Sequence, residues 1–550
     1  LMSITGLPGQ GPMRVGIPMA DLSAGNYTTI AILIALLERE VSGEGQWVHT
    51  SLLEAMIAML DFQAARWLVA GEEPPQAGNN HPTSIPTGVF KTKDGHINIA
   101  AAGDIMWDRL CEVLNASDMQ DNPDYATGQT RSENRNAVNA EIEKYTTQKT
   151  SAQWIDVLTE AGVPCGPIYS INEMDNYRIN NLMDKAKLDV IVLFSAENIF
   201  YLTQSPTVLR LKDFQQTRPN SSRLIITIKE KNKNESILLV PEFDYKENKK
   251  LSNKVKLFSY KQYFMNPILF LAKILKSMAF ANKKIGLEMS SLSTNYFLLL
   301  KEYLPLSDFY DIKNIMEEVR SIKTDEEIRK IKNTVNLMDK AFLKSFKETK
   351  VGDSEFSVHN NIIRNLYDLG CIPDYSSSKT HIGKIMKEVH KKPRSNKKIK
   401  IGDLIRTDFS ASFNGYVGNL SRMAVVGKPS KNQINKYNIL KSVHKKTIEF
   451  IKPGIKASDI WEYSHKMMRL AGVYHPIPEG TMIGHSIGVN VHEEPMILKN
   501  NHKLIKENMI IVIEPVICKD FFQIQDHILV QKNNSILISK KFNTNQLYII

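Results

Sequence analysis

The sequence is poor in cysteine and lacks the usual marks of export. Only four cysteines occur among 550 residues, and they are far apart with no CxxC pair, at Cys111, Cys165, Cys371 and Cys518. Such spacing supports neither a zinc clip nor a disulfide framework. We find no signal peptide at the start and no apolar run near the ~20 residues that cross a bilayer. We therefore expect a cytoplasmic protein with no membrane partner, in which the short apolar stretch 30–37 is a buried helix.

Basic charge is scarce in the first part of the chain and abundant in the second. Residues 1–175 hold 10 Lys and Arg against 22 Asp and Glu, whereas the remainder holds 60 against 37. This break in usage predicts two blocks of different origin. The lysines of the second block are scattered among acids, and the dense run 390–400 is typical of a solvated loop. We therefore expect no nucleic-acid partner.

The length exceeds what one hydrophobic core usually serves, and we predict three domains, at 1–175, 176–319 and 320–550. The elements expected in the first are a helix to about residue 40 capped by Asp21, a strand at 47–50, a long helix at 52–70, a hairpin turning at Asp94-Gly95, and helices near 104–115, 132–147 and 151–161. The later elements include strands near 188–194 and 285–289, a long helix from 325, and strand pairs 404–413 with 420–427 and 509–517 with 524–532. The predicted fold class is α/β and α+β.

The first block contains the phrases PMADLSAGNYTTIAILIALL, PTGVFKTKDGHINIAA and AGVPCGPIYSINEM. In these phrases, over roughly residues 1–174, it resembles the family III CoA-transferases (the CaiB/BaiF family). The resemblance implies that Asp21 is the nucleophile, which takes an acyl group as a mixed anhydride and exchanges it with coenzyme A. A helix N-terminus would favour the ionised carboxylate. The alternative is that Asp21 only caps its helix.

The match departs from the CoA-transferase family in its extent. The family fold begins with a long Rossmann-like half that holds much of the coenzyme A, and this chain starts just before the nucleophile phrase, with Leu rather than Met. Without the part of the fold that holds coenzyme A, the Asp21 carboxylate lacks the positioning of its substrate that supplies most of the rate. We therefore expect a truncated CoA-transferase segment that is inactive alone.

The second block contains the phrases MDKAKLDVIVLFSAENIFYLT, EVRSIKTDEEIRKIK and GHSIGVNVHEEP. Over roughly residues 176–547 it resembles the creatinase, aminopeptidase P and prolidase family. The resemblance implies a small α/β N-terminal domain followed by a C-terminal pita-bread domain. In metal-dependent members, two Asp, one His and two Glu bind two ions that activate a bridging water. Those five positions map onto Asp408, Asn419, His485, Glu514 and Gln525, and two substrate-binding histidines map onto His390 and His492.

Two of the mapped metal positions, Asn419 and Gln525, carry amides instead of carboxylates. An amide has nearly the shape of a carboxylate and none of its charge, so we do not expect this pair to help retain two divalent ions. Three alternatives stay open. The site could use two ions, hold one weakly bound ion (manganese, cobalt or zinc) at Asp408, His485 and Glu514, or bind no metal, with hydrogen bonds to the amides.

A metal-free reaction has a precedent within the same family. Creatinase hydrolyses a guanidino C–N bond with a histidine as general acid and base, and that histidine maps near His390. A histidine close to its reference pKa is a competent proton carrier at neutral pH. The alternative is that His390 is an ordinary surface residue of a lysine-rich loop.

The combined interpretation is a hydrolase that acts on a small C–N bond and is fused to a truncated CoA-transferase segment. The substrate would be a small molecule or short peptide, either of X-Pro type or a creatine-like amidino compound. The alternatives are a non-catalytic binding protein with the same pocket, CoA-transferase activity of the first block, and an artificial junction of two reading frames. Members of both families commonly form homodimers, and the resemblance implies the same here.

Overall fold

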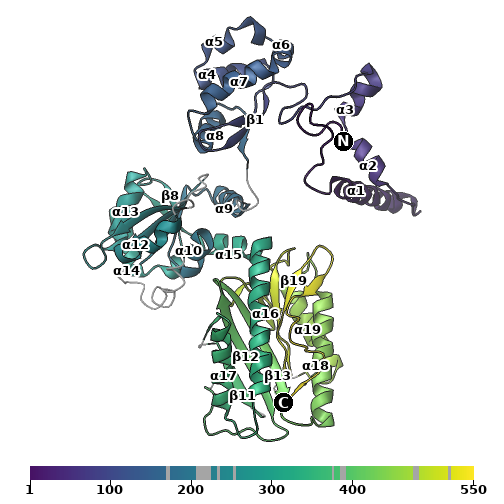
Figure 1. The fold of residues 1–550 in the computed structure, drawn as a ribbon, viewed down its shortest axis with the longest axis vertical. Coiled ribbons are helices and arrows are strands. Elements are labelled where there is room, and N and C mark those ends of the chain that lie inside the picture. Colours follow the sequence, from purple (N-terminus) through teal and green to yellow (C-terminus); the bar gives the residue numbers. More distant parts are fainter. Residues whose placement is uncertain are drawn as a thin grey trace. The chain divides into compact units, whose positions relative to one another are not determined.

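The computed structural model describes residues 1–168, 174–205, 224–231, 236–251, 255–374, 377–383, 392–474, 482–517 and 522–550. The chain forms two compact units, Leu1–Asn172 and Glu173–Ile550, and each mixes helices with sheets (Figure 1). Of the predicted site residues, His390 lies outside the described residues.

The first unit contains a small antiparallel sheet. Strand β1 (Thr87–Lys91) pairs with β2 (His96–Ala100), which pairs with β3 (Cys165–Pro167). The turn at Asp94-Gly95 joins β1 to β2, so the predicted hairpin is confirmed. The helices that follow β2 are α4 (Asp104–Leu114), α5 (Ser117–Gln120), a 3₁₀ turn (Pro123–Tyr125), α6 (Gly128–Glu133), α7 (Arg135–Thr146) and α8 (Ser151–Glu160). Their apolar faces and the sheet share one core, which includes Phe90, Ile97, Ile99, Trp107, Leu110, Ile142 and Leu158.

Helix α1 (Met19–Ser42) differs from its prediction in two ways. The stretch 30–37 is helical, but the expectation that it is buried is wrong, because most of its large apolar side chains are exposed: Ile30, Ile32, Leu33, Ile34, Leu36 and Leu37. Among the described residues α1 is long and apolar enough to cross a membrane, by length and composition alone. The expectation of no such segment is therefore also wrong. Apolar content identified the helix but gave no information about what covers it.

The start of α1 corrects the predicted role of Asp21 as a helix cap. The helix begins after Pro18, and no side chain caps its first turn. Asp21 lies within that first turn and is exposed. Its carboxylate is still close to the helix N-terminus, where the helix dipole favours negative charge.

Two further predictions for the first unit are wrong. Residues 47–50 form no strand, and the helix expected at 52–70 is broken into α2 (Leu52–Ala58), α3 (Phe62–Ala65) and a π-helical turn (Arg66–Ala70). The break coincides with Asp61, whose positive φ of 46° is incompatible with a continuous right-handed helix.

The second unit begins with an α/β part. Its sheet has the strand order β7-β6-β5-β4-β8-β9, with β4, β8 and β9 parallel. The strands are β4 (Val190–Leu193), β5 (Ile226–Glu230), β6 (Ser236–Pro241), β7 (Val255–Tyr260), β8 (Lys284–Leu287) and β9 (Asp308–Asp311). The helices are α9 (Met174–Lys185), α10 (Ala196–Thr203), α12 (Glu242–Asn248), α13 (Pro267–Ser277), α14 (Thr294–Tyr303) and α15 (Lys313–Ser321), with 3₁₀ turns at Lys249–Leu251 and Met289–Ser291.

Among its described residues, the rest of the second unit combines four helices with two five-stranded, mainly antiparallel sheets (Figure 1). The helices are α16 (Asp325–Glu348), α17 (Glu355–Asp368), α18 (Lys431–Phe450) and α19 (Ala457–Leu470). The first sheet comprises β10 (Ile372–Pro373), β11 (Lys379–Ile382), β12 (Leu404–Phe413), β13 (Tyr416–Val425) and β21 (Tyr548–Ile549). The second comprises β14 (Gly484–Ser486), β15 (Glu493–Met496), β16 (Ile510–Ile513), β19 (Asp526–Val530) and β20 (Ser535–Leu537), and β17 (Val516–Ile517) pairs with β18 (Phe522–Gln523).

The hairpin of β12 and β13 fixes the register on which the site depends. Its two-residue turn, Asn414-Gly415, has positive φ at both positions, as hairpin turns of this kind require. A side chain at Gly415 would also collide with the ring of Phe200. Helix α16 packs on β13 through a common core that contains Val335, Met338 and Leu420. The turn and this packing together hold one face of the hairpin against the second sheet.

Candidate functional site

The β12–β13 hairpin places two mapped residues on one face. Asp408 on β12 lies opposite Ser421, and Asn419 on β13 lies opposite Ser410. Directly opposed residues of an antiparallel pair point to the same side. Arg406, two residues before Asp408, therefore shares this face as well.

The second sheet supplies the other mapped residues. His485 on β14 lies opposite Val512 of β16, and Glu514 follows the end of β16. Gln525 precedes β19 and forms a bridge with Ser421 of the hairpin. The structure therefore brings the five mapped metal positions to one place in the fold.

The two amides bind to each other in this site. The side-chain N–H of Gln525 donates to Asn419 Oδ1. Asn419 Nδ2 lies 2.9 Å from Ser410 Oγ and 3.4 Å from Asp408 Oδ1. Both amides are buried, and Asn419 directs its oxygen and its N–H groups at neighbouring protein groups, whereas a carboxylate at that position would direct its oxygens at an ion.

Arg406 reaches both remaining carboxylates, one directly and one through an amide. Its Nη2 lies 3.2 Å from Asp408 Oδ2, and its Nε donates to Gln523 Oε1 at 2.7 Å. Gln523 Nε2 in turn donates to Glu514 Oε2 at 3.2 Å. Burial lowers the pKa of Arg406 to about 10, although Asp408 and Glu514 oppose the shift. The guanidinium is therefore charged at neutral pH.

Burial dominates the titration of the groups around Arg406. It raises the pKa of Glu514 to about 8, with a further increase from Asp408 and an opposing effect of Arg406. It lowers the pKa of His485 to about 3, so this ring is neutral at pH 7. His485 Nδ1 lies 2.9 Å from the carbonyl oxygen of Ser486, which can only accept, and Nδ1 therefore carries the proton.

A pair of divalent ions does not fit these residues. Both Asp408 oxygens already face donors, Arg406 and Asn419. Among the described residues, no group of three or more His, Cys, Asp or Glu is arranged to hold a metal ion. Of the other mapped acceptors, Gln525 Oε1 has no hydrogen-bond partner among the described residues and His485 Nε2 lies 3.3 Å from Asn419 Oδ1; both are uncharged. The site thus lacks the fixed negative charge that two hard cations need.

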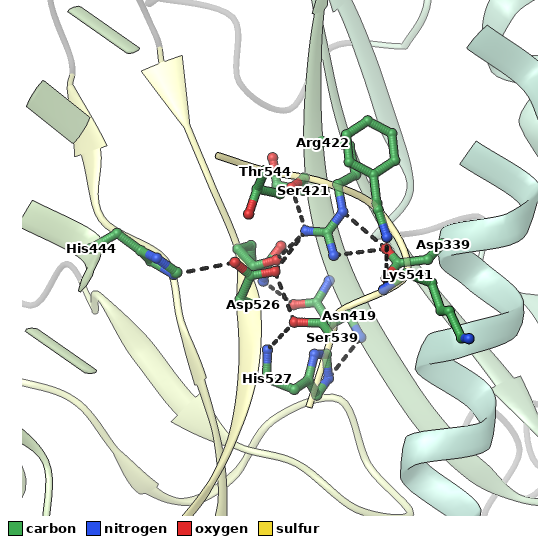
Figure 2. Close-up of polar contacts among 12 residues, drawn as sticks. Asp339, Asn419, Ser421, Arg422, His444, Asp526, His527, Ser539, Lys541 and Thr544 are labelled. Carbon is green, nitrogen blue, oxygen red and sulfur yellow. Dashed lines mark hydrogen bonds and ion pairs between the residues drawn. The ribbon is translucent and has the colours of Figure 1, made fainter. Parts of the chain in front are cut away.

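A fully buried ion cluster lies behind the site (Figure 2). Arg422 of β13 lies between Asp339 of α16, at 2.7 Å, and Asp526 of β19, at 3.0 Å. Arg422 Nη1 also donates to the backbone carbonyl of Gln525 at 2.8 Å. Asp339 accepts the backbone N–H groups of Lys541 and Phe542 at 3.1 Å each. The cluster therefore joins both sheets to α16 and holds Gln525 in place.

His492 occupies a different environment from the mapped metal positions. It is exposed, and its ring lies almost perpendicular to that of His485 with centroids 4.5 Å apart. Desolvation by the surrounding pocket lowers its pKa below the ordinary value, so His492 is neutral at pH 7. A cavity of about 410 Å³ opens beside it, lined by residues of both parts of the second unit.

Buried charges join the α/β part to the pita-bread part at this cavity. Arg320 of α15 contacts Glu493 at 2.8 Å, and Lys323 contacts the same carboxylate at 3.2 Å. Arg320 also donates to Asn198 of α10 at 2.8 Å, and Asn198 donates to Glu288 at 2.8 Å. The cavity wall beside His492 is therefore a continuous polar network.

Sequence reasoning missed three residues of this region. It assigned no role to Arg406, Arg422 or Gln523, although Arg422 lies only three residues after Asn419. A basic residue two positions before Asp408 was the available signal for Arg406. Asp21 belongs to the other unit, where it makes no hydrogen bond or ion pair with described residues.

The fold and site together define a pita-bread protein with an α/β N-terminal part. Comparison with protein families agrees: residues 177–322 match the creatinase/prolidase N-terminal domain and residues 329–539 match metallopeptidase family M24. Residues 1–189 match CoA-transferase family III. Both predicted family resemblances and the predicted fold class are therefore confirmed.

Individual relatives follow the same division. The chain is 26% identical to the Xaa-Pro dipeptidase of Pyrococcus horikoshii over 376 residues, which cover 66% of this chain and 96% of that protein. The crystal structure of a prolidase from Pyrococcus horikoshii OT3 covers 67% of this chain with a TM-score of 0.56 and 24% identity, and 98% of that structure is matched. The first block is 32% identical to the acetyl-CoA:oxalate CoA-transferase of Acetobacter aceti over 177 residues, 32% of this chain. The chain spans about half the length of its CoA-transferase relatives, 46% in this case.

Proposed function

We propose that residues 176–550 form a hydrolase of the Xaa-Pro dipeptidase and creatinase class, which acts on a small C–N bond and has a degenerate metal site. The observation that carries the proposal is the exposed, neutral His492, which lines the cavity and whose ring lies 4.5 Å from that of His485 in the mapped site. The match to nearly the full length of an Xaa-Pro dipeptidase supports an Xaa-Pro dipeptide as substrate, and the match to the creatinase/prolidase N-terminal domain motivates testing an amidino compound.

The chemistry assigned to His492 is proton transfer. A neutral imidazole can take a proton from a water molecule while the water oxygen bonds to the substrate carbon. The same proton then passes to the leaving nitrogen as the C–N bond breaks, which restores both the ring and the charge balance. His390, the other proposed proton carrier, lies outside the described residues.

The proposal is tested with the full chain and two substrate sets, Xaa-Pro dipeptides and creatine-like amidino compounds, with products followed by mass spectrometry. We expect turnover that survives a chelator and that falls at least about 100-fold in His492→Ala. His502→Ala is the matched control, because His502 is an exposed histidine of the same domain. Turnover that requires added manganese and is abolished by the chelator would contradict the degenerate metal site.

A non-catalytic binding protein is the second candidate. It is favoured by the pairing of Asn419 with Gln525 and of Arg406 with Asp408, because these contacts occupy groups that a metal ion or a reacting water would need. Binding of a substrate analogue measured by calorimetry, with no turnover of any substrate tested, would support this candidate over the hydrolase.

The first block is proposed as a CoA-transferase segment without activity of its own. Asp21 is exposed and makes no positioning contact with the described residues, and a nucleophile gains most of its rate from positioning. We expect no acyl exchange between coenzyme A thioesters and acids, and no change in Asp21→Asn.

The proposed location is the cytoplasm, supported by the free thiols of Cys111, Cys165 and Cys371.

A further inference from the structure

Arg406 is a positive charge built into the place where the fold family holds its metal ions. It lies on β12 two residues before Asp408, and its side chain is only 4% exposed. A buried guanidinium needs an anionic partner, because an unpaired charge in the interior is costly. Among the described residues, the acidic groups nearest to it are Asp408 and Glu514.

The contacts of Arg406 reach both carboxylates that remain in the site. Arg406 Nη2 donates a hydrogen bond to Asp408 Oδ2 at 3.2 Å. Glu514 Oε2 accepts a hydrogen bond from the side-chain N–H of Gln523, and the side-chain oxygen of Gln523 accepts one from Arg406. Gln523 therefore connects the guanidinium to Glu514 by hydrogen bonds, and the ion pair of Arg406 among the described residues is with Asp408.

The guanidinium and the two amides all make the site less negative than the mapped set of carboxylates would be. Asn419 and Gln525 remove two negative charges from the mapped set, and Arg406 adds a positive one. Two divalent ions would then face only two carboxylates while a fixed cation lies within hydrogen-bond distance of one of them. Repulsion between cations a few ångströms apart is strong where water is excluded.

We propose that Arg406 is a resident cation that takes over the charge-balancing role of metal ions at Asp408 and excludes divalent ions from the site. The inference rests on the proposed degenerate metal site and is independent of whether the pocket hydrolyses its ligand. The alternative is an ordinary structural ion pair that leaves metal affinity unaffected.

The test restores the carboxylates with and without the guanidinium. Four full-length proteins are compared by calorimetric titration with Mn²⁺: the wild type, R406M, N419D/Q525E and R406M/N419D/Q525E. We expect the triple variant to bind Mn²⁺ about 100-fold more tightly than N419D/Q525E, because only the triple variant lacks the competing cation. We expect the wild type and R406M to bind weakly, since they lack two carboxylates.

Two controls isolate the charge of Arg406 from its shape and from general charge effects. R406K/N419D/Q525E keeps a cation and should bind as weakly as N419D/Q525E. R364M/N419D/Q525E removes an exposed arginine that pairs with Glu348 elsewhere in the domain and should also match N419D/Q525E. Each protein is first checked for folding by circular dichroism, and R406Q replaces R406M if the methionine variant does not fold.

The outcomes separate this inference from the proposed function. Equal Mn²⁺ affinity of N419D/Q525E with and without Arg406 would overturn the role of Arg406 and leave the degenerate site intact. Tight binding of two Mn²⁺ ions by the wild type would instead overturn the degenerate site itself.

Discussion

The second unit contains two clusters in which an arginine lies near two acidic residues, and their surroundings differ. Arg422 binds Asp339 and Asp526, and all three side chains are fully buried. Arg406 serves Asp408 and Glu514, and the Asp408 side chain is 15% exposed. The comparison shows that one arginine with two carboxylates can be a scaffold or part of a pocket. Access of water and ligand to the carboxylates separates the two cases.

The largest expected loss of stability follows from removing Arg422 of the fully buried cluster. Arg422→Met leaves Asp339 and Asp526 buried without a cation, and breaking such a cluster costs about 3–5 kcal/mol of stability. Urea unfolding followed by circular dichroism measures the loss. Arg364→Met, which removes an exposed arginine, should change the free energy of unfolding by less than about 0.5 kcal/mol. Equal effects of the two substitutions would show that the buried cluster is not a scaffold.

The stability contributed by the buried ion pairs of Glu493 with Arg320 and Lys323 should fall in acid. Burial alone would raise the pKa of Glu493, but Arg320 and Lys323 reverse this and lower it below the ordinary value. The stability from this carboxylate is therefore present above about pH 4.5, its unfolded pKa, and is lost as the pH falls through the lowered folded pKa. Glu493→Gln should be less stable than the wild type by about 3 kcal/mol at pH 7.

The readout for Glu493 is urea unfolding at a series of pH values. The difference between Glu493→Gln and the wild type should shrink as the pH falls below 4.5. A difference that is the same at every pH would mean that the charge of Glu493 does not contribute to the junction.

A smaller loss is expected at the pocket arginine. Arg406→Met removes one charged hydrogen bond to Asp408 and the link to Gln523, which costs about 1.5 kcal/mol. The cost is lower than at Arg422 because Asp408 reaches solvent and retains its contact with Asn419. A loss as large as that of Arg422→Met in the same unfolding assay would place Arg406 in the scaffold.

The smallest change in stability is expected for a substitution on the exposed face of α1 in the first unit. Ile34 is 61% exposed, whereas Ile142 of α7 is fully buried. Ile34→Glu should change stability by less than about 0.5 kcal/mol, while Ile142→Ala should cost about 2–5 kcal/mol by leaving a cavity. Thermal unfolding of both variants measures the contrast, and a large loss in Ile34→Glu would show that α1 is covered in solution.

The sequence predicted local structure better than long-range contacts. The hairpin at Asp94-Gly95, the long helix α16 and the β12–β13 pair follow from turn chemistry and from periodicity, which are local signals. Capping by Asp21 failed because Pro18 starts the helix one turn earlier than the acidic residue suggested. The predicted helix at 52–70 failed because apolar composition does not reveal the backbone reversal at Asp61.

The candidate site was predictable in its residues and not in its contacts. The spacing of the phrases mapped Asp408, Asn419 and Gln525, and the structure brings them together. The role of Arg406 depends on Gln523, 117 positions away, and no periodic or compositional signal connects residues at that distance. Contacts of that kind arise from the pairing of the two sheets and become visible only in the folded chain.

The central claim is that this pita-bread pocket balances its carboxylates with an arginine and not with metal. The most direct measurement is the metal content of the full-length wild-type protein after equilibration with Mn²⁺ and gel filtration, determined by elemental mass spectrometry. We expect well below one ion per chain. Two retained ions per chain would contradict the account.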